Sequence, residues 1–236
     1  MKDRKLLNSE LGRLTPEEYR TVRPSSGIVL VLDNVRSAHN VGSAFRTGDA
    51  FGVDKIYLGG ICPVPPSPEL HKVALGAEES VPSEHVDDVV DLVRRLQAAG
   101  YTVIAVEQTE HSVKLDEYCA GLEEGVSPRG ACPPPDKGRG RGPLDTSPEG
   151  TQETMGGAGV ERSGTESPLG DTPSSTPRYA LVFGNEVHGV QQEVVDACDF
   201  ALEIPQKGTK HSLNVSVSIG VVLWALVQRM DCQTGA

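Results

Sequence analysis

The sequence predicts an α/β fold: a mostly parallel sheet with helices on both faces. Short β-branched apolar runs, such as Ile28 to Leu32, alternate with segments whose apolar residues recur at helical spacing. The order strand, helix, strand, helix, strand is typical of a parallel sheet whose ligand site lies at the carboxyl ends of the strands. At 236 residues, the chain is long enough for a substantial core.

The first 24 residues are interpreted as an N-terminal arm, and residues 25–236 as a single domain. The segment from Thr15 to Glu18, TPEE, has the pattern of a capping box with proline at the first helical position. It predicts a short helix through Tyr19. Six Lys/Arg against four Asp/Glu in the first 23 residues make this arm locally positive.

The stretch from Asn34 to Gly52 predicts a corner between the first strand and a helix. Asn40 stands where a helix N-cap belongs, and Gly52 is a natural C-terminal stop. Arg46 lies about 140° around the helix from Val41 and therefore points away from the apolar stripe. Taken alone, Arg46 reads as a solvated helical arginine. The stripe consists of Val41, Ala44, Phe45, Gly48 and Phe51.

The next elements follow the same rhythm. Lys55 to Leu58 is predicted to be a second strand, and the proline-rich stretch from Gly59 to Glu79 a long loop, a class of segment that is often functional. Ser83 is predicted to cap a helix that stops before Gly100, and a strand from Tyr101 to Val106 follows. The apolar positions of that helix are Val86, Val89, Val90, Val93 and Leu96.

Residues 121–177 interrupt the pattern. They hold 12 of the 26 glycines and 9 of the 17 prolines, with no aromatic residue and no isoleucine. Such a segment buries too little apolar surface to offset its ordering entropy, so it is predicted to be a disordered insertion within the single domain. A linker between two domains is the alternative, but the part after it would be a marginal domain alone.

The overall charge argues against a nucleic-acid partner. The formal charge is -11 and the sequence pI is near 5.0, whereas RNA usually requires a basic face. Nine acidic against five basic residues fall within the predicted insertion, so about -4 of the total belongs to that segment. The five cysteines form no CxxC pair and no metal-type cluster with histidines, which favours buried or incidental thiols and no metal site. The N-terminus lacks a signal-peptide pattern, and Leu213 to Met230 is interrupted by polar residues, so a cytoplasmic protein without a membrane segment is expected.

Two later segments resemble the Asn34 corner in that each follows the end of an apolar strand. ALVFGNEVHG, from Ala180 to Gly189, is an apolar strand that ends in Gly-Asn-Glu, where a backbone can approach a ligand closely. The segment from Ile204 to Trp224, IPQKGTKHSLNVSVSIGVVLW, reads as a strand end, a loop and an apolar helix. No GxGxxG follows any predicted strand, so the dinucleotide fingerprint of an α/β oxidoreductase is missing.

In order and position, these three segments resemble the signature motifs of the SpoU (TrmH-like) RNA 2'-O-ribose methyltransferases of the SPOUT superfamily. The resemblance covers about residues 25–120 and 178–230. It implies S-adenosylmethionine bound in a C-terminal deep trefoil knot, a homodimer, and structured RNA as substrate, with tRNA favoured and rRNA as the other candidate. Gln206 and Trp224 depart from the usual motif, where methionine and tyrosine are frequent, without touching the expected chemistry.

The resemblance also implies site residues. The cofactor would be lined by Val106, Glu107, Gln108, Gly184, Asn185, Glu186, Ile204, Pro205, Gly208 and Leu213. The catalytic set would be Asn40, Arg46, Ser212 and Asn214. Arg46, which is always protonated, would hold a phosphate and stabilise the developing alkoxide. Ser212 is also a candidate N-cap of the last helix. Glu186, His211 and an RNA phosphate stay open as the base.

The last helix supports the dimer expectation independently. It is apolar nearly all round, which requires burial on more than one side, and a self-complementary interface would supply the second side. Val222 and Leu226 are predicted to face the partner. The rival function is a catalytically silent RNA- or nucleotide-binding relative, and the presence of Arg46, Ser212 and Asn214 together speaks against it.

Overall fold

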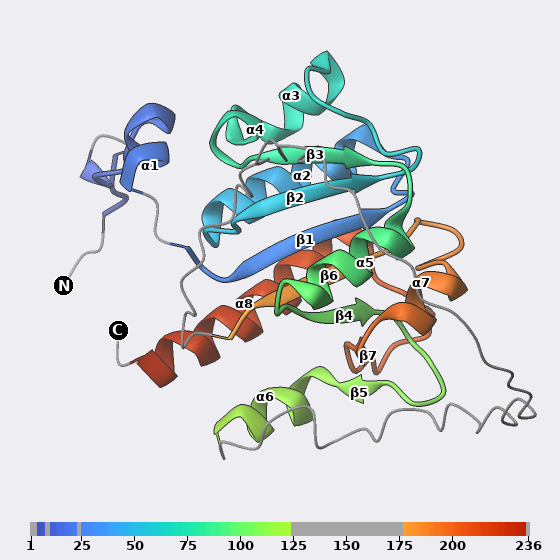
Figure 1. The fold of residues 1–236 in the computed structure, drawn as a ribbon. Coiled ribbons are helices and arrows are strands. Elements are labelled where there is room, and N and C mark those ends of the chain that lie inside the picture. Colours follow the sequence, from blue (N-terminus) through green and yellow to red (C-terminus); the bar gives the residue numbers. More distant parts are fainter. Residues whose placement is uncertain (1–3, 8–9, 23–24, 124–176, 235–236) are drawn as a thin grey trace, which may run out of the picture. The chain divides into compact units, whose positions relative to one another are not determined.

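A parallel seven-stranded sheet forms the described part of the protein (Figure 1). The computed structural model describes residues 4–7, 10–22, 25–123 and 177–234. The strand order is β3-β2-β1-β6-β4-β7-β5, and each strand of this part runs parallel to the strands it pairs with. The predicted fold class is therefore confirmed, while the C-terminal knot stays a prediction. The strands are β1 (Ile28–Asp33), β2 (Lys55–Gly59), β3 (Ser83–Val86), β4 (Thr102–Val106), β5 (Val113–Lys114), β6 (Tyr179–Phe183) and β7 (Phe200–Glu203).

Helices cover both faces of the sheet because the side chains of each strand alternate. In β1, Leu30 and Leu32 belong to a core cluster that includes residues of α2, α6 and α8. Val29 and Val31 point to the other face and belong to the cluster with α5 and α7. The helices are α1 (Pro16–Val22), α2 (Ala38–Ala50), α3 (Pro68–Ala74), α4 (Ala77–Ser80), α5 (Val89–Ala98), α6 (Leu115–Glu123), α7 (Gln192–Ala197) and α8 (Val215–Thr234).

The corner after β1 has the predicted form with one correction. Its apolar stripe is buried except for the partly buried Phe51, and Arg46 is exposed, as expected. The N-cap, however, is Ser37, whose hydroxyl accepts a hydrogen bond from the Asn40 backbone N–H at 3.3 Å. The prediction of Asn40 as the cap was wrong because the helix begins two residues before it. The Asn40 side chain is thereby free to reach the loop after β6.

Two predictions about the middle of the chain were also wrong. The stretch from Gly59 to Glu79 is not all loop, since the Ser67 cap and Pro68 at the first position begin α3, and α4 follows. The segment from Ser83 to Val86 pairs with β2 as a strand. Its helix begins only at Val89, with Asp88 as the N-cap that accepts from the Asp91 N–H.

Two further predictions concern the N-terminal arm and the insertion at 121–177. The N-terminal capping box is confirmed, because Thr15 N–H donates to the Glu18 carboxylate and Glu18 N–H donates to the Thr15 hydroxyl. The predicted insertion at 121–177 begins too early, since α6 extends to Glu123. Residues 124–176 lie outside the described residues, so the insertion and the single-domain reading stay predictions.

The last helix buries one side and exposes another. Val222 and Leu226, predicted to face a partner, are 0% exposed and pack into the core, so that prediction was wrong. Val217, Val221 and Trp224 are 50%, 37% and 58% exposed. They recur at i, i+4 and i+7 and therefore form the outward apolar stripe of α8.

The described part carries no helix with the length and apolar character needed to cross a membrane. Cys62, Cys119 and Cys198 are unpaired, and burial raises the pKa of the Cys62 and Cys198 thiols to about 12. Thiols with such pKa values stay protonated at neutral pH, which fits the prediction of buried or incidental cysteines.

Candidate active site

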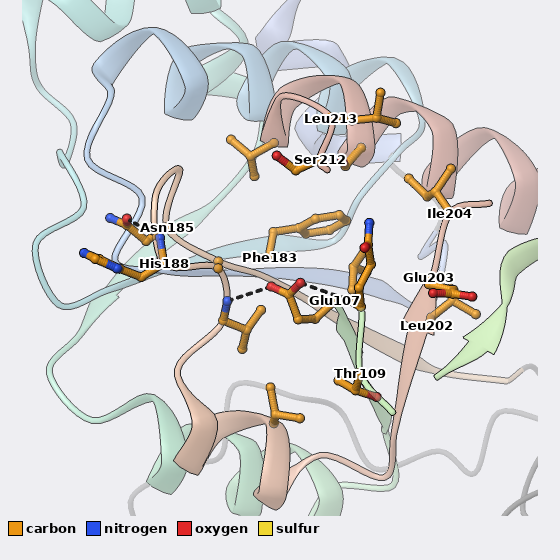
Figure 2. Close-up of a pocket in the computed structure, with 18 of the residues that line it drawn as sticks. Glu107, Thr109, Phe183, Asn185, His188, Leu202, Glu203, Ile204, Ser212 and Leu213 are labelled. Carbon is orange, nitrogen blue, oxygen red and sulfur yellow. Dashed lines mark hydrogen bonds between the residues drawn. The ribbon is translucent and has the colours of Figure 1, made fainter. Parts of the chain in front are cut away.

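A cavity of about 840 Å³ opens where β4, β6 and β7 end (Figure 2). The loops after these three strands and the segment leading into α8 form its walls. Phe183, Leu202 and Ile204 supply apolar surface, and Ser212 and Leu213 line the side of α8. The position matches the rule that parallel sheets bind ligands at the carboxyl ends of their strands.

The loop after β6 folds back on itself to form one wall. Asn185 and Gly189 exchange two backbone hydrogen bonds of 2.9 Å each. A Cβ at Gly184 would overlap the backbone of Gly189, and one at Gly189 would overlap the Glu107 carboxylate. Gly189 also has a φ of +69°, so glycine is required at both positions for this loop to close.

Glu186 ties this loop to the start of α2. Its carboxylate accepts hydrogen bonds from the Arg36 N–H at 3.1 Å, the Ser37 N–H at 3.0 Å and the Asn40 side-chain amide at 2.8 Å. Partial burial alone would raise the pKa of Glu186, but the bonds from Asn40 and these backbone groups outweigh burial and hold the pKa below its ordinary value. An acceptor so fully engaged is a weak general base.

Asn214 extends the same chain of contacts to α8. Its side-chain amide donates to the Asn40 side-chain oxygen Oδ1 at 3.3 Å, and its own Oδ1 accepts from the Ser216 N–H at 2.8 Å. Asn214 therefore caps α8, and the alternative reading of Ser212 as the cap was wrong. Ser212 is exposed and lines the cavity instead.

A buried network supports the site from beneath. Asp33, at the end of β1, is fully buried and accepts hydrogen bonds from the Gln191 N–H and the Asn34 amide, both at 2.8 Å. Burial raises the pKa of Asp33, and these two hydrogen bonds offset part of the rise. Asn34 sits at φ +55° and its backbone oxygen accepts from the Asn185 side chain at 2.7 Å. The network thus joins the loops after β1 and β6.

The structure brings most of the predicted site residues together. Eight of the ten predicted cofactor residues line the cavity, and Pro205 and Gly208 do not. Of the four predicted catalytic residues, Ser212 alone is a lining residue. Asn40 and Asn214 adjoin the cavity through Glu186, and Arg46 lies exposed on α2 outside it.

Sequence reasoning missed several residues of this region. Thr109, His188, Gln192, Asp196 and Glu203 also line the cavity. Thr109 and Glu203 lie at or just after the ends of β4 and β7, and this position near a strand end could have predicted them. The position of His188 depends on how the loop after β6 folds back, which the sequence pattern does not indicate. Asp33 is a further residue that was not predicted to belong to the site, because its hydrogen bond with Gln191 depends on the folded loops.

The charges lining the cavity define what it can hold. Within the described residues, no lysine or arginine lines it. Its lining includes five carboxylates, those of Glu107, Glu110, Glu186, Asp196 and Glu203. Such a lining disfavours a polyphosphate and suits a ligand with positive charge. No group of histidine, cysteine and carboxylate side chains within the described residues is arranged to hold a metal ion.

Fold and site together define an α/β protein with a parallel sheet and a cofactor-sized pocket at its strand ends. The chain belongs to the SpoU rRNA Methylase family, whose family model matches residues 27–126 and 150–224. The sequence-based recognition of this family is therefore confirmed.

Individual relatives agree with this assignment. A 23S rRNA (guanosine-2'-O-)-methyltransferase, RlmB of Nitrosomonas europaea, is 27% identical over 209 residues, which cover 89% of this chain and 59% of the relative. The chain thus spans about three fifths of the length of this curated relative. The crystal structure of the A. aeolicus TrmH/SpoU tRNA modifying enzyme is similar with a TM-score of 0.61 and 22% identity, covering 93% of this chain and 84% of that one. The AdoMet-bound rRNA methyltransferase from Sinorhizobium meliloti has a TM-score of 0.57 at 22% identity, covering 92% and 61%.

Proposed function

We propose that the protein transfers a methyl group from S-adenosylmethionine to a ribose 2'-hydroxyl of a structured RNA. The observation that carries the proposal is the cavity itself: residues of two family motifs converge on it, and a third motif adjoins it through Glu186. A second observation is its acidic lining. S-adenosylmethionine supplies an electrophilic methyl group on a sulfonium cation, and carboxylates suit that positive charge. The apolar surface of Phe183, Leu202 and Ile204 suits the adenine ring.

The reaction needs the hydroxyl to be oriented and its proton to be removed. The bound cofactor would supply the methyl group and keep the electrons of its carbon–sulfur bond, and the 2'-hydroxyl would give its proton to a base. Ser212 lines the cavity, and we assign it the role of orienting the hydroxyl. The Glu186 carboxylate already accepts hydrogen bonds from the start of α2, so we assign the proton to His211, which lines the cavity beside Ser212. An RNA phosphate is the alternative.

The acidic chain keeps basic side chains outside the pocket. Lys207 and Lys210 are exposed on the segment between β7 and α8, and Arg36 and Arg46 are exposed on the side of α2. We assign these four to the RNA backbone, with Arg46 holding the phosphate beside the reacting ribose and stabilising the developing alkoxide. Asn40 and Asn214 act as positioning residues that hold α2 and α8 against the loop after β6.

The proposed assembly is a homodimer through α8. Val217, Val221 and Trp224 form an exposed apolar stripe, and the Trp224 ring lies 6.3 Å from that of Phe51 at the end of α2. A second copy would cover this stripe in a self-complementary contact. The resemblance implies active sites near this interface.

The test is a transfer assay with purified protein and S-adenosylmethionine labelled in the methyl group. Separate tRNA and rRNA pools are offered, because the named relatives include a tRNA and an rRNA enzyme. The expected product resists alkaline cleavage at one position, since a methylated 2'-oxygen cannot attack the adjacent phosphate. Label on a base, or no label in either pool, would contradict the proposal.

A further inference from the structure

Two neighbouring side chains at the end of β4, Glu107 and Gln108, reach opposite walls of the cavity. The backbone fixes their position, because Glu107 N–H donates to the Leu202 oxygen of β7 at 3.1 Å. From there the Glu107 carboxylate accepts from the Val190 N–H at 3.0 Å, on the wall formed by the loop after β6 (Figure 2). The Gln108 amide donates to the His211 oxygen at 2.9 Å, on the wall that leads to Ser212.

The two walls differ in how firmly they are held. The loop after β6 is closed by its own backbone pair and by the hydrogen bonds of Asn185 and Glu186. The segment from Pro205 to Leu213 is exposed at every residue. Within the described structure, the bond from Gln108 to His211 is the single hydrogen bond that any residue of this segment makes. Among the described residues, Gln108 is therefore the one side chain that restrains this wall by a hydrogen bond.

We propose that Glu107 and Gln108 are positioning residues that set the width of the cavity. Glu107 anchors the fixed wall, and Gln108 latches the segment from Pro205 to Leu213 in the conformation that binds the cofactor. A segment held in its bound form loses less conformational entropy when the ligand binds, so the latch raises affinity without requiring a contact to the ligand. The inference rests on the proposed function for the identity of the ligand, S-adenosylmethionine.

The latch can be tested without a ligand, by the rate of tryptic cleavage within the segment from Pro205 to Leu213. Lys207 and Lys210 are exposed within the latched segment and are trypsin sites. Cleavage of a folded protein follows the population of locally opened states. Gln108→Met keeps the length of the side chain and removes its donor, so peptides ending at these two lysines should appear several-fold faster than in the wild type. Gln108→Glu should be faster still, because its carboxylate repels the His211 oxygen.

The matched control is Gln97→Met. Gln97 also donates its side-chain amide to a backbone oxygen, that of Ala197 at 2.9 Å, but this bond joins α5 to α7 at residues that do not line the cavity. It should leave cleavage at Lys207 and Lys210 unchanged. In calorimetric titrations with S-adenosylmethionine, Gln108→Met should raise Kd about 3- to 10-fold, the worth of one hydrogen bond, and Gln97→Met should not.

The outcomes separate the latch from the proposed function. Wild-type cleavage rates in both Gln108 variants would overturn the latch, whatever the ligand. Faster cleavage with an unchanged Kd would overturn its role in cofactor binding. If the wild type itself does not bind S-adenosylmethionine, the proposed function fails, and faster cleavage in the variants would still support Gln108 as the restraint on this segment.

Discussion

Arg46 is an exposed side chain on α2 that no other described group holds in place. Replacing it with alanine should lower the rate of methyl transfer on the order of 100- to 1000-fold, the usual loss when a group that stabilises developing charge is removed. The fold and the affinity for S-adenosylmethionine should stay near wild type, since Arg46 does not line the cavity. Single-turnover rates with RNA measure this effect, and Arg46→Lys is the control that keeps the charge. A fully active Arg46→Ala would remove the residue from the mechanism.

Glu186 gives the site a predictable pH dependence. Its pKa lies below the ordinary glutamate value of 4.5 in the folded protein, so its contribution to stability is present above that value and is lost as pH falls through the folded pKa. Glu186→Gln should therefore be less stable than the wild type at neutral pH, and the difference should shrink below about pH 4.5. Chemical denaturation across pH measures it. A difference that stays constant with pH would show that the charge is irrelevant.

Lys207 and Lys210 test whether the basic side chains around the cavity meet RNA. The double variant to alanine should weaken RNA binding and flatten its salt dependence by about one unit of slope per lysine, because fewer counterions are released. Its Kd for S-adenosylmethionine should not change. Binding titrations over a range of salt concentrations give the slope. An unaltered slope would place the RNA elsewhere on the molecule.

At the scale of elements, α8 offers two adjacent valines with opposite expected behaviour. Val221→Glu puts a charge on the exposed stripe and should split the dimer while the subunit stays folded. Val222→Glu buries an unpaired charge in the core, which costs several kcal/mol and should unfold the protein. Sedimentation and circular dichroism distinguish the two.

The monomer made by Val221→Glu should also lose methyl transfer, because the resemblance implies sites near the interface. A folded monomer with full activity would show that one chain completes the site. A Val221→Glu variant that remained a dimer would place the interface away from this stripe.

Elements were predictable from sequence wherever periodicity decided them. The strands β1, β2 and β4 and the stripe of α2 followed from apolar spacing alone. The helix predicted to begin at Ser83 was wrong at its start. Ser83 to Val86 is a short strand, and its apolar residue Val86 happens to fit the helical spacing of the helix that follows. The prediction of the outward face of α8 was wrong for a related reason. In a helix that is apolar nearly all round, the sequence pattern does not distinguish the stripe that packs against the sheet from the others.

The candidate site was predictable only in part. The Gly184 corner was recognisable because strand ends in a parallel sheet converge. The hydrogen bonds of Glu186 with α2, and of Gln108 with His211, join residues more than 100 positions apart, and only the folded backbone brings them together.

At the scale of the whole molecule, residues 124–176 test the single-domain reading. Their glycine- and proline-rich composition predicts that they add little to the core. Replacing them with a short Gly/Ser linker should shift the Tm little, since loop-closure entropy depends only weakly on length. Thermal denaturation of the two proteins is the measurement. Loss of folding on replacement would make the segment part of the structure.

The central claim is that the cavity at the ends of β4, β6 and β7 holds S-adenosylmethionine. A calorimetric titration of the wild type beside Ile204→Trp, which fills the apolar wall of the cavity, tests it most directly. We predict one site per chain in the wild type and a Kd at least about tenfold higher in the variant, because the larger ring occupies the space of the ligand. Unchanged affinity in a folded Ile204→Trp protein would place the cofactor elsewhere and contradict the account.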